Sequence, residues 1–210
     1  MPLSDGRASI IACLVPRVEV KPAWLDAYVA HEDPLVRACN VIALVVAGNQ
    51  PFYPLYIHWI VGHCAAPSLL TFLSTPFFAA VPAIARRNAR AGRAVLVLAG
   101  MANTVLVAKI YGQVSGVEIF LMPCALIAAA FFRPSERKIS FGLLAVSIVI
   151  FLGLDGRYGT PICQATVAGE KALAGLHVLS AGMLVVFVGF VLAGLTGSGL
   201  PDNRRSPRRQ

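Results

Sequence analysis

The histidines are the residues whose chemistry could serve a function most directly, and their spacing argues against a metal site. His58 and His63 lie five positions apart, whereas two imidazoles reach one metal ion from the same helix face when they are one turn apart. His177 lies far along the chain, so the three could form a metal or haem site only if tertiary structure assembled them. We predict no metal site, and we assign the histidines beside Tyr53, Tyr56 and Trp59 to an aromatic belt at a membrane surface.

Nucleophilic chemistry has no recognisable motif in this sequence. Ser68, Ser74 and Ser180 lack histidine and aspartate partners in a pattern typical of a hydrolase. Small residues of this kind let membrane helices pack closely against one another. We therefore predict that the chain is not an enzyme and that it uses no cofactor.

Five polar residues in or beside apolar segments are better candidates for ligand binding or for coupling. They are Asn49, Gln50, Asn103, Lys109 and Glu118. Polar groups are costly inside a bilayer, so those that occur there tend to be paired or functional. For the three amides we expect hydrogen bonds between helices, with ligand binding as the alternative. Lys109 and Glu118 flank a glycine-containing turn, where we expect them to pair or to extend toward the membrane surface, with ligand capture as the alternative.

The segments that carry these residues have the composition of a membrane protein. The 210 residues are 57% hydrophobic and 13% charged, which is more apolar surface than a soluble domain of this size could bury. A helix needs roughly 20 apolar residues to cross the hydrocarbon core. Six segments reach or approach that length, at about 38–62, 65–85, 94–111, 114–132, 139–154 and 172–195. Prolines in the first two should kink those helices without ending them.

From these segments we predict an all-α, polytopic membrane protein. Its six transmembrane helices would form a bundle within residues 35–196. The fifth helix is the weakest of the six because its apolar segment is short.

The positions of lysine and arginine predict the orientation of this bundle. Of the 18 basic residues, 15 fall before the first segment, between the second and third, between the fourth and fifth, or after the sixth. Only Lys109, Arg157 and Lys171 fall on the other side of the membrane. Because basic residues concentrate in cytoplasmic loops, we expect both termini in the cytoplasm and the chain in the inner (plasma) membrane. Topology thus explains the net charge of +8, and we predict no nucleic-acid binding.

Two flanking segments are expected outside the bilayer on the cytoplasmic side. In residues 1–34, Pro22 is well placed to open a short amphipathic helix on the inner membrane surface. The residues of its apolar face would be Trp24, Leu25, Tyr28 and Val29. The segment 197–210 is rich in glycine, proline, serine and arginine, so we expect a disordered basic tail beside the anionic leaflet.

The five cysteines do not form a disulfide framework. Cys64 and Cys163 are the pair that could meet on the outer side, in an oxidising compartment. Sequence does not give the distance between them, and we expect two free thiols.

Three stretches carry a resemblance to a known class of membrane module. They are the run TVLVAKIYGQVSGVEIFLMPC within 103–124, the RPSER segment at 133–137, and NQPFYPLY at 49–56 with the exit at 76–87. Over most of 37–195 the chain resembles the bacterial six-span sensor modules that precede cytoplasmic adenylate cyclase, diguanylate cyclase and histidine kinase domains. It departs from them after its last span, where about fifteen residues follow instead of an output domain.

The resemblance implies a sensory or regulatory bundle with no catalytic domain. Such a module would bind a small or apolar ligand on its outer side and pass the signal to a separate cytoplasmic protein or to a second copy of itself. Two alternatives stay open: a small-solute or ion transporter, and a structural subunit of a membrane complex. Transporters usually show two similar halves with matched broken helices, and the proline-rich first two segments have no such counterpart here.

Overall fold

The computed structural model describes residues 23–62 and 64–197, and within these ranges the chain is helical with no strands. The residues not described include His63 and nearly all of the predicted basic tail, so the expectations for them lie outside the described part of the chain. The α-helices are α2 (Ala23–Val29), α3 (Pro34–Asn49), α4 (Tyr53–Val61), α5 (Ala65–Ser68), α6 (Thr75–Arg87), α7 (Ala89–Tyr111), α8 (Leu121–Ala130), α9 (Arg137–Leu154) and α10 (Val167–Gly197). Short 3-10 turns connect several of them: η1 (Gln50–Phe52), η2 (Leu69–Leu73), η3 (Gln113–Ser115), η4 (Val117–Phe120) and η5 (Pro134–Glu136).

Five helical stretches are long and apolar enough to cross a membrane, which confirms five of the six predicted spans. They are Pro34–Val61, Ala65–Arg87, Ala89–Tyr111, Pro134–Leu154 and Val167–Leu195. The chain is therefore a multi-pass membrane protein with an all-α fold. Prolines interrupt the α-helix in the first two stretches without ending the stretches, as predicted: Pro51 lies in η1, and Pro76 follows η2 at the start of α6.

The fourth predicted span is the short one, not the fifth. Its helical part, Val117–Ala130, falls below the length of the other five. Its four residues of 3-10 helix and ten of α-helix rise by about 2 Å and about 1.5 Å each, or about 23 Å together. The fifth span gains length from η5, which adds a turn before α9.

Capping residues and glycines set the ends of α7, the helix at the centre of the bundle. Asn88 is extended (φ −150°), and its Oδ1 accepts hydrogen bonds from the backbone N–H groups of Arg90 and Ala91 at 3.0 and 3.1 Å, which begins the helix. At the other end Gly112 has a φ of +81° that disfavours other residues. These two ends make α7 a rod of 23 residues.

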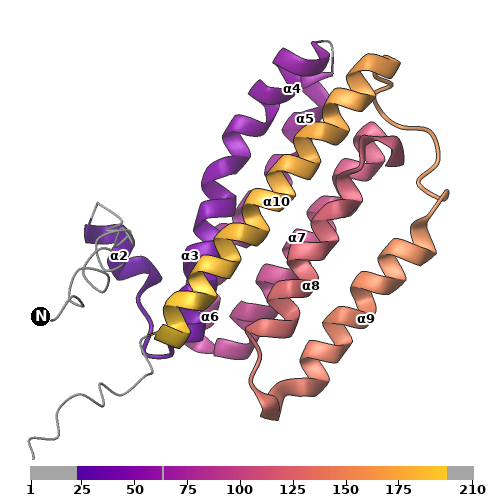
Figure 1. Cartoon of the computed structure of the whole chain (residues 1–210). Helices are drawn as coiled ribbons and strands as arrows, with labels where there is room; N and C mark the ends of the chain where they lie inside the picture. Colours follow the sequence, from indigo (N-terminus) through magenta and orange to yellow (C-terminus); the bar gives the residue numbers. More distant parts are fainter. Residues whose placement is uncertain (1–22, 63, 198–210) are drawn as a thin grey trace, which may run out of the picture.

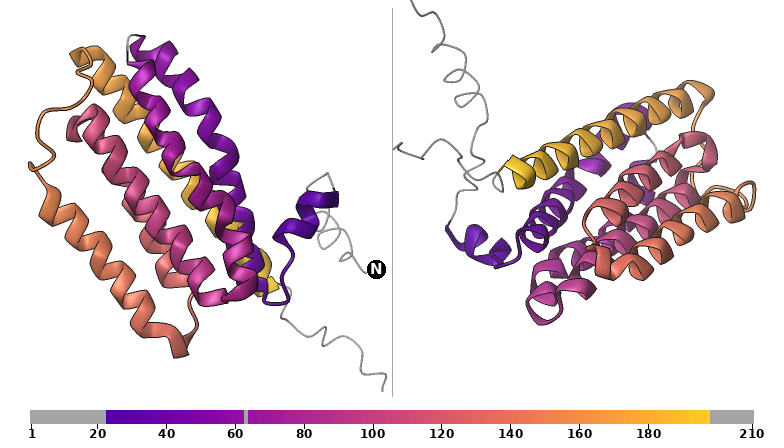
Figure 2. Two further views of the ribbon diagram at one scale, coloured as in Figure 1. Left: turned by 180° about the vertical axis from the view of Figure 1, so that it is seen from behind. Right: turned by 60° about the horizontal axis from the view of Figure 1, so that its bottom comes forward.

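The helices run alternately up and down, with α7 in contact with α3, α6, α8 and α9. In Figure 1, α10 lies at the front of the bundle, and it contacts α3, α4 and α8. In Figures 1 and 2, α9 stands at one edge of the bundle and α2 lies beyond the opposite edge. Apolar side chains on α9 and α10 are exposed, including Phe141, Val149, Leu152, Leu179 and Phe190. Such surfaces are suited to contact with lipid tails.

The short N-terminal helix is present at α2, and it is tied to the bundle. The Tyr28 hydroxyl donates to the carbonyl of Ala79 on α6 at 2.9 Å, and Arg86 donates to the carbonyl of Tyr28 at 2.9 Å. Val29 is buried, whereas Trp24 is 67% exposed. The predicted apolar face is thus shared between the bundle and the surroundings, and its contact with an inner membrane surface stays a prediction.

Candidate functional site

A cavity of about 700 Å³ lies inside the bundle. Its walls come from α3, η1, α4, η2, α6, α7, η4, α8 and α10, and most of its lining side chains are aliphatic or aromatic. Its polar lining residues include Asn49, Gln50, Asn103, His177 and Ser180. Among the described residues that line it there is no aspartate, glutamate, lysine or arginine. The cavity can therefore hold a neutral molecule with one or two hydrogen-bonding groups and has no charge to pair with an ion.

A hydrogen-bonded chain of side chains joins three elements at the cavity wall. Gln50 on η1 donates from Nε2 to the Ser74 Oγ at 2.8 Å. Ser74 in turn donates to the Oδ1 of Asn103 on α7, at 2.9 Å, or to the carbonyl of Thr71, at 2.7 Å. This arrangement confirms the expected hydrogen bonds between helical segments for Gln50 and Asn103. For Asn49 the expectation was wrong, because its side chain is exposed and forms no hydrogen bond with the described residues. The same arrangement leaves the Asn103 amide N–H₂ without a partner within the described part of the chain, at the wall of the cavity.

His177 forms another part of the wall and is 1% exposed. Its Nδ1 lies 2.7 Å from the carbonyl of Ser115, and because a carbonyl only accepts hydrogen bonds, Nδ1 carries the proton. Its Nε2 then accepts from the Tyr53 hydroxyl at 3.0 Å. Both ring nitrogens of a neutral imidazole are used in this way, so His177 orients Tyr53 and has no nitrogen left for a metal ion.

Of the three histidines that the sequence raised as weak metal candidates, the two in the described part of the chain lie in different surroundings. His58 is exposed on α4, His177 is buried in the bundle, and His63 lies outside the described residues. Within 23–62 and 64–197 no group of three or more histidine, cysteine, aspartate or glutamate side chains is placed to hold a metal ion.

Lys109 and Glu118 lie at one end of the bundle; of the two expectations for them, pairing with each other or extending toward the membrane surface, the ion pair does not form. The Lys109 ammonium donates to the carbonyls of Tyr158 and Thr160, each at 2.9 Å. Glu118 instead accepts from Gln113 Nε2 at 3.1 Å. Lys109 bonds to the linker between α9 and α10 and not to Glu118, because the carbonyl groups of the linker lie within hydrogen-bonding distance of its ammonium group. Neither residue lines the cavity. Of the five candidates from the sequence, Asn49, Gln50 and Asn103 therefore lie at the cavity, and Lys109 and Glu118 lie outside it at one end of the bundle.

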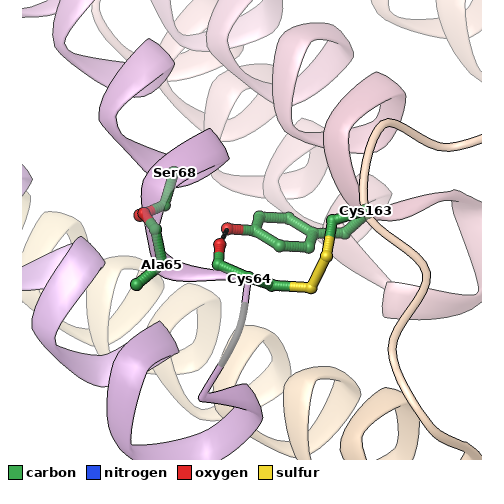
Figure 3. Close-up of a disulfide and its surroundings, with 5 residues drawn as sticks. Cys64, Ala65, Ser68 and Cys163 are labelled. Atoms are coloured by element: carbon green, nitrogen blue, oxygen red, sulfur yellow. Dashed lines mark hydrogen bonds between the residues drawn. A yellow bond between two sulfur atoms is a disulfide. The ribbon is translucent and has the colours of Figure 1, made fainter.

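A disulfide between Cys64 and Cys163 closes this end of the bundle, and the expectation of two free thiols was wrong. Figure 3 shows the bond joining the turn before α5 to the linker before α10. The two Cα atoms are 5.9 Å apart, within the range that a disulfide spans. The Cys163 N–H also donates to the carbonyl of Ile110, and the Tyr111 hydroxyl donates to the carbonyl of Cys64. These contacts hold the linker against α7, and tertiary packing supplies the proximity that sequence could not.

Tyr158 in the same linker lies close to two carboxylates. Burial raises the pKa of its phenol well above the usual range, and the nearby Glu118 and Asp155 carboxylates raise it further. The phenol therefore stays protonated at any physiological pH. Its hydroxyl is available as a donor beside Glu118, whose Oε1 is buried without a hydrogen-bond partner among the described residues.

The opposite end of the bundle holds a pocket of about 440 Å³ that is rich in arginine. We call it the arginine pocket. It is lined by Asp33, Arg87, Asn88, Ala89, Arg90, Arg93, Arg133 and Glu136. From the sequence we interpreted these arginines only as topology signals, and their convergence was not predicted. The lone acid in the RPSER segment was the available clue, because a glutamate among basic residues has arginines to pair with.

Buried groups build the floor of the arginine pocket. Arg93 is 2% exposed and donates from Nη2 to Glu136 at 2.9 Å and from Nη1 to the carbonyl of Phe131 at 2.6 Å. The same Glu136 oxygen accepts from Arg90 Nε at 3.0 Å, and the other carboxylate oxygen accepts from the backbone N–H of Arg133 at 3.0 Å. Arg133 also pairs with Asp33 at 2.8 Å. This network links the starts of α3, α7 and α9.

Comparison of the chain with protein-family models, with curated proteins and with solved structures found no match.

Proposed function

We propose that this chain is a sensory or regulatory membrane module, not an enzyme, that binds a small, neutral, mostly apolar molecule in the cavity. The observation that carries the proposal is the cavity itself, which has about 700 Å³ of space and an uncharged lining. Sites for small molecules are typically concave, mostly apolar and about 300–1,000 Å³ in volume, with few polar groups that fix orientation. This cavity fits that description.

The polar groups at the wall indicate which ligand would fit. The Asn103 amide offers an N–H₂ group, and Asn49 adds a second amide. Both are suited to a carbonyl or hydroxyl oxygen on an otherwise apolar body. Because an ion entering this site would lose its hydration without gaining a counter-charge, the lining disfavours the ion-carrier alternative.

The ligand would enter from the lipid phase. Three residues line the cavity and are also exposed at the surface of the bundle: Val45 on α3, and Leu179 and Met183 on α10. The cavity is therefore continuous with the surface between α3 and α10, a surface suited to lipid tails. An apolar molecule dissolved in the bilayer could reach the site without crossing water.

Ligand binding would be reported by a change in helix packing. α10 forms one wall of the cavity and runs to the end of the bundle that holds the arginine pocket (Figure 1). A ligand that binds one packing of α10 against α3 more tightly than another shifts the population between them. A cytoplasmic signalling protein or a second copy of the chain would read this shift.

The topology that goes with this function has six crossings, with α8 and η4 as the fourth. Arg93 at the start of α7 contacts Phe131 just after the end of α8, so α8 returns the chain to the end where α7 began. We propose that this end faces the cytoplasm of a bacterial cell and that the membrane is the inner one.

The test uses a neutral aromatic ketone, the fluorophore prodan, and the full chain in phosphatidylcholine nanodiscs. We expect a saturable component of prodan fluorescence with one site per chain, above the unsaturable partition into lipid. Ser180→Trp should remove that component by filling the cavity, and Asn103→Leu should weaken it about tenfold by removing one hydrogen bond. Val186→Trp is the matched control, because Val186 lies on α10 outside the cavity lining and its replacement should leave binding unchanged.

Two outcomes would contradict the proposal. The first is saturable binding that is the same in Ser180→Trp as in the unmodified chain, which would place the probe elsewhere. The second is rapid uptake of glycerol into liposomes that contain the protein, beyond that of empty liposomes, which would favour a channel or transporter for neutral solutes.

A further inference from the structure

The arginine pocket has more positive charge than its own acids neutralise. Four arginines line it against two carboxylates, which leaves an excess of two positive charges. Glu136 is already shared by Arg90 and Arg93, and Asp33 is paired with Arg133 and also accepts from the backbone N–H of Leu35. Both acids are thus occupied, so further positive charge has to be balanced from outside the chain.

Several guanidinium donors remain available at the mouth of the pocket. Arg90 uses only its Nε toward Glu136 and is 64% exposed, and Arg133 uses one Nη2 toward Asp33 and is 56% exposed. Arg87 is exposed at the end of α6 and has no ion pair within the described residues. Arginine presents planar pairs of N–H groups that match the oxygens of a phosphate group.

The floor of the pocket is held in place by hydrogen bonds, whereas the arginines at its mouth have free donors. Arg93 is held by three hydrogen bonds, to Ala89, Phe131 and Glu136. Through Glu136 it orients Arg90 toward the same space. The N-terminus of α7 also faces the pocket, since Asn88, Ala89 and Arg90 all line it, and the partial positive charge of a helix N-terminus favours an anion.

The position of the pocket determines what it can meet. It lies at the end of the bundle where α6 ends and α7 begins, which is the lower end in Figure 1. In a chain whose helices cross the membrane, residues at a helix end lie at the depth of the lipid headgroups. We propose that the arginine pocket binds a phosphate group, presented by an anionic lipid headgroup or as soluble phosphate.

The test measures thermal stability of the full chain in nanodiscs with two ligand arms. One arm compares phosphatidylcholine with a mixture that contains phosphatidylglycerol. The other adds inorganic phosphate to phosphatidylcholine nanodiscs, against sodium chloride of equal ionic strength. We expect a higher melting temperature in at least one arm, and the arm that responds identifies the source of the phosphate group.

Matched variants assign the effect to the pocket. Arg87→Gln with Arg90→Gln should weaken the response to phosphate or to phosphatidylglycerol about tenfold or more in apparent affinity. Arg137→Gln with Lys138→Gln removes the same charge from exposed positions at the same end of the bundle but outside the pocket, and should leave the response intact. If the double glutamine variant does not fold, the double variant Arg87→Lys with Arg90→Lys is tested in its place, because it keeps the charge and removes the guanidinium groups.

The proposal is overturned by a lack of response in both arms, or by an equal loss of response in the pocket pair and the control pair. The second result would mean that general surface charge, and not this pocket, attracts the anion. Because prodan binding does not involve these residues, failure here leaves the proposed ligand cavity standing, and failure of the cavity leaves this site standing.

Discussion

At the scale of single residues, Arg93 and Glu136 form a buried ion pair whose loss would cost the most stability. Both side chains are nearly inaccessible, at 2% and 5% exposed. The cost of taking two charges out of water is offset only while each has its partners. Arg93 achieves this with donors to Ala89, Phe131 and Glu136, and Glu136 adds the backbone N–H of Arg133.

Replacement of Glu136 by glutamine should therefore destabilise the protein strongly. We expect the free energy of unfolding to fall by about 3–5 kcal/mol, because Arg93 is left charged and uncompensated in a buried site. Thermal unfolding in detergent measures this effect. Arg133→Gln is the control: it removes the more exposed pair with Asp33, which is worth about 0–1 kcal/mol. Equal stability of the two variants would show that the buried pair contributes no more than a surface one.

At the scale of elements, the linker between α9 and α10 is the segment whose position depends most on contacts distant in sequence. It is attached to α7 through backbone hydrogen bonds at Ile162 and Cys163 and through Lys109. The disulfide then joins it to the turn before α5, across 99 residues of sequence. The linker therefore acts as a cap on the end of the bundle above the cavity wall formed by Tyr53 and His177.

The disulfide can be tested by counting thiols. In denatured protein isolated from membranes, two more cysteines per chain should react with maleimide after reduction than before it. Cys64→Ser with Cys163→Ser should abolish this difference and lower the free energy of unfolding by about 2–5 kcal/mol, since the closed loop is long. Cys39→Ser, at a buried free cysteine, is the control and should keep the difference of two. An unchanged count after reduction would show that the bond does not form in the cell.

The fourth predicted span is short, and neighbouring elements can compensate for its length. The 3-10 turn η4 stretches the chain more per residue than an α-helix does. Gly116, with a φ of +66°, allows the tight turn that lets η3 and η4 follow α7 directly. α8 is also covered by α7, α9 and α10. A helix enclosed by protein in this way does not depend on its own length to match the bilayer.

At the scale of the whole molecule, the positions of the basic residues and of the disulfide both favour the proposed orientation. The described basic residues between the second and third and between the fourth and fifth predicted spans gather at one end, with Arg90 and Arg93 bonded to Glu136 near Arg133. The disulfide lies at the other end, with Lys109 and the linker. Basic residues favour the cytoplasmic side, whereas disulfides persist in oxidising compartments outside it.

Cysteine labelling of whole cells tests this orientation. In a Cys13→Ser background, Arg157→Cys should react with a membrane-impermeant maleimide added outside, because the linker is expected to face outward. Arg137→Cys should react only after the cells are permeabilised. Both positions are exposed in the structure, so each serves as the accessibility control for the other. The reverse pattern would invert the proposed topology and would place the arginine pocket outside the cell.

The helices and their membrane character were readable from the sequence because they depend on local properties. Runs of apolar residues and the positions of prolines predicted five of the spans and their interruptions, and clusters of arginine predicted which connections share an end. The same local evidence placed Asn49, Gln50 and Asn103 inside the membrane segments. It misjudged the fourth and fifth spans, since the 3-10 turns that change their lengths depend on the neighbouring helices.

The sites, in contrast, were decided by the tertiary structure, because they depend on distances between residues far apart in the chain. Cys64 meets Cys163, Tyr53 meets His177 across 124 positions, and Arg93 meets Glu136 across 43. Lys109 and Glu118, although near in sequence, have other partners: Lys109 bonds to the linker, and Glu118 accepts from Gln113. Sequence alone determined that this chain enters a membrane as helices, and only the packing of those helices created a neutral cavity at the centre and a cationic pocket at one end.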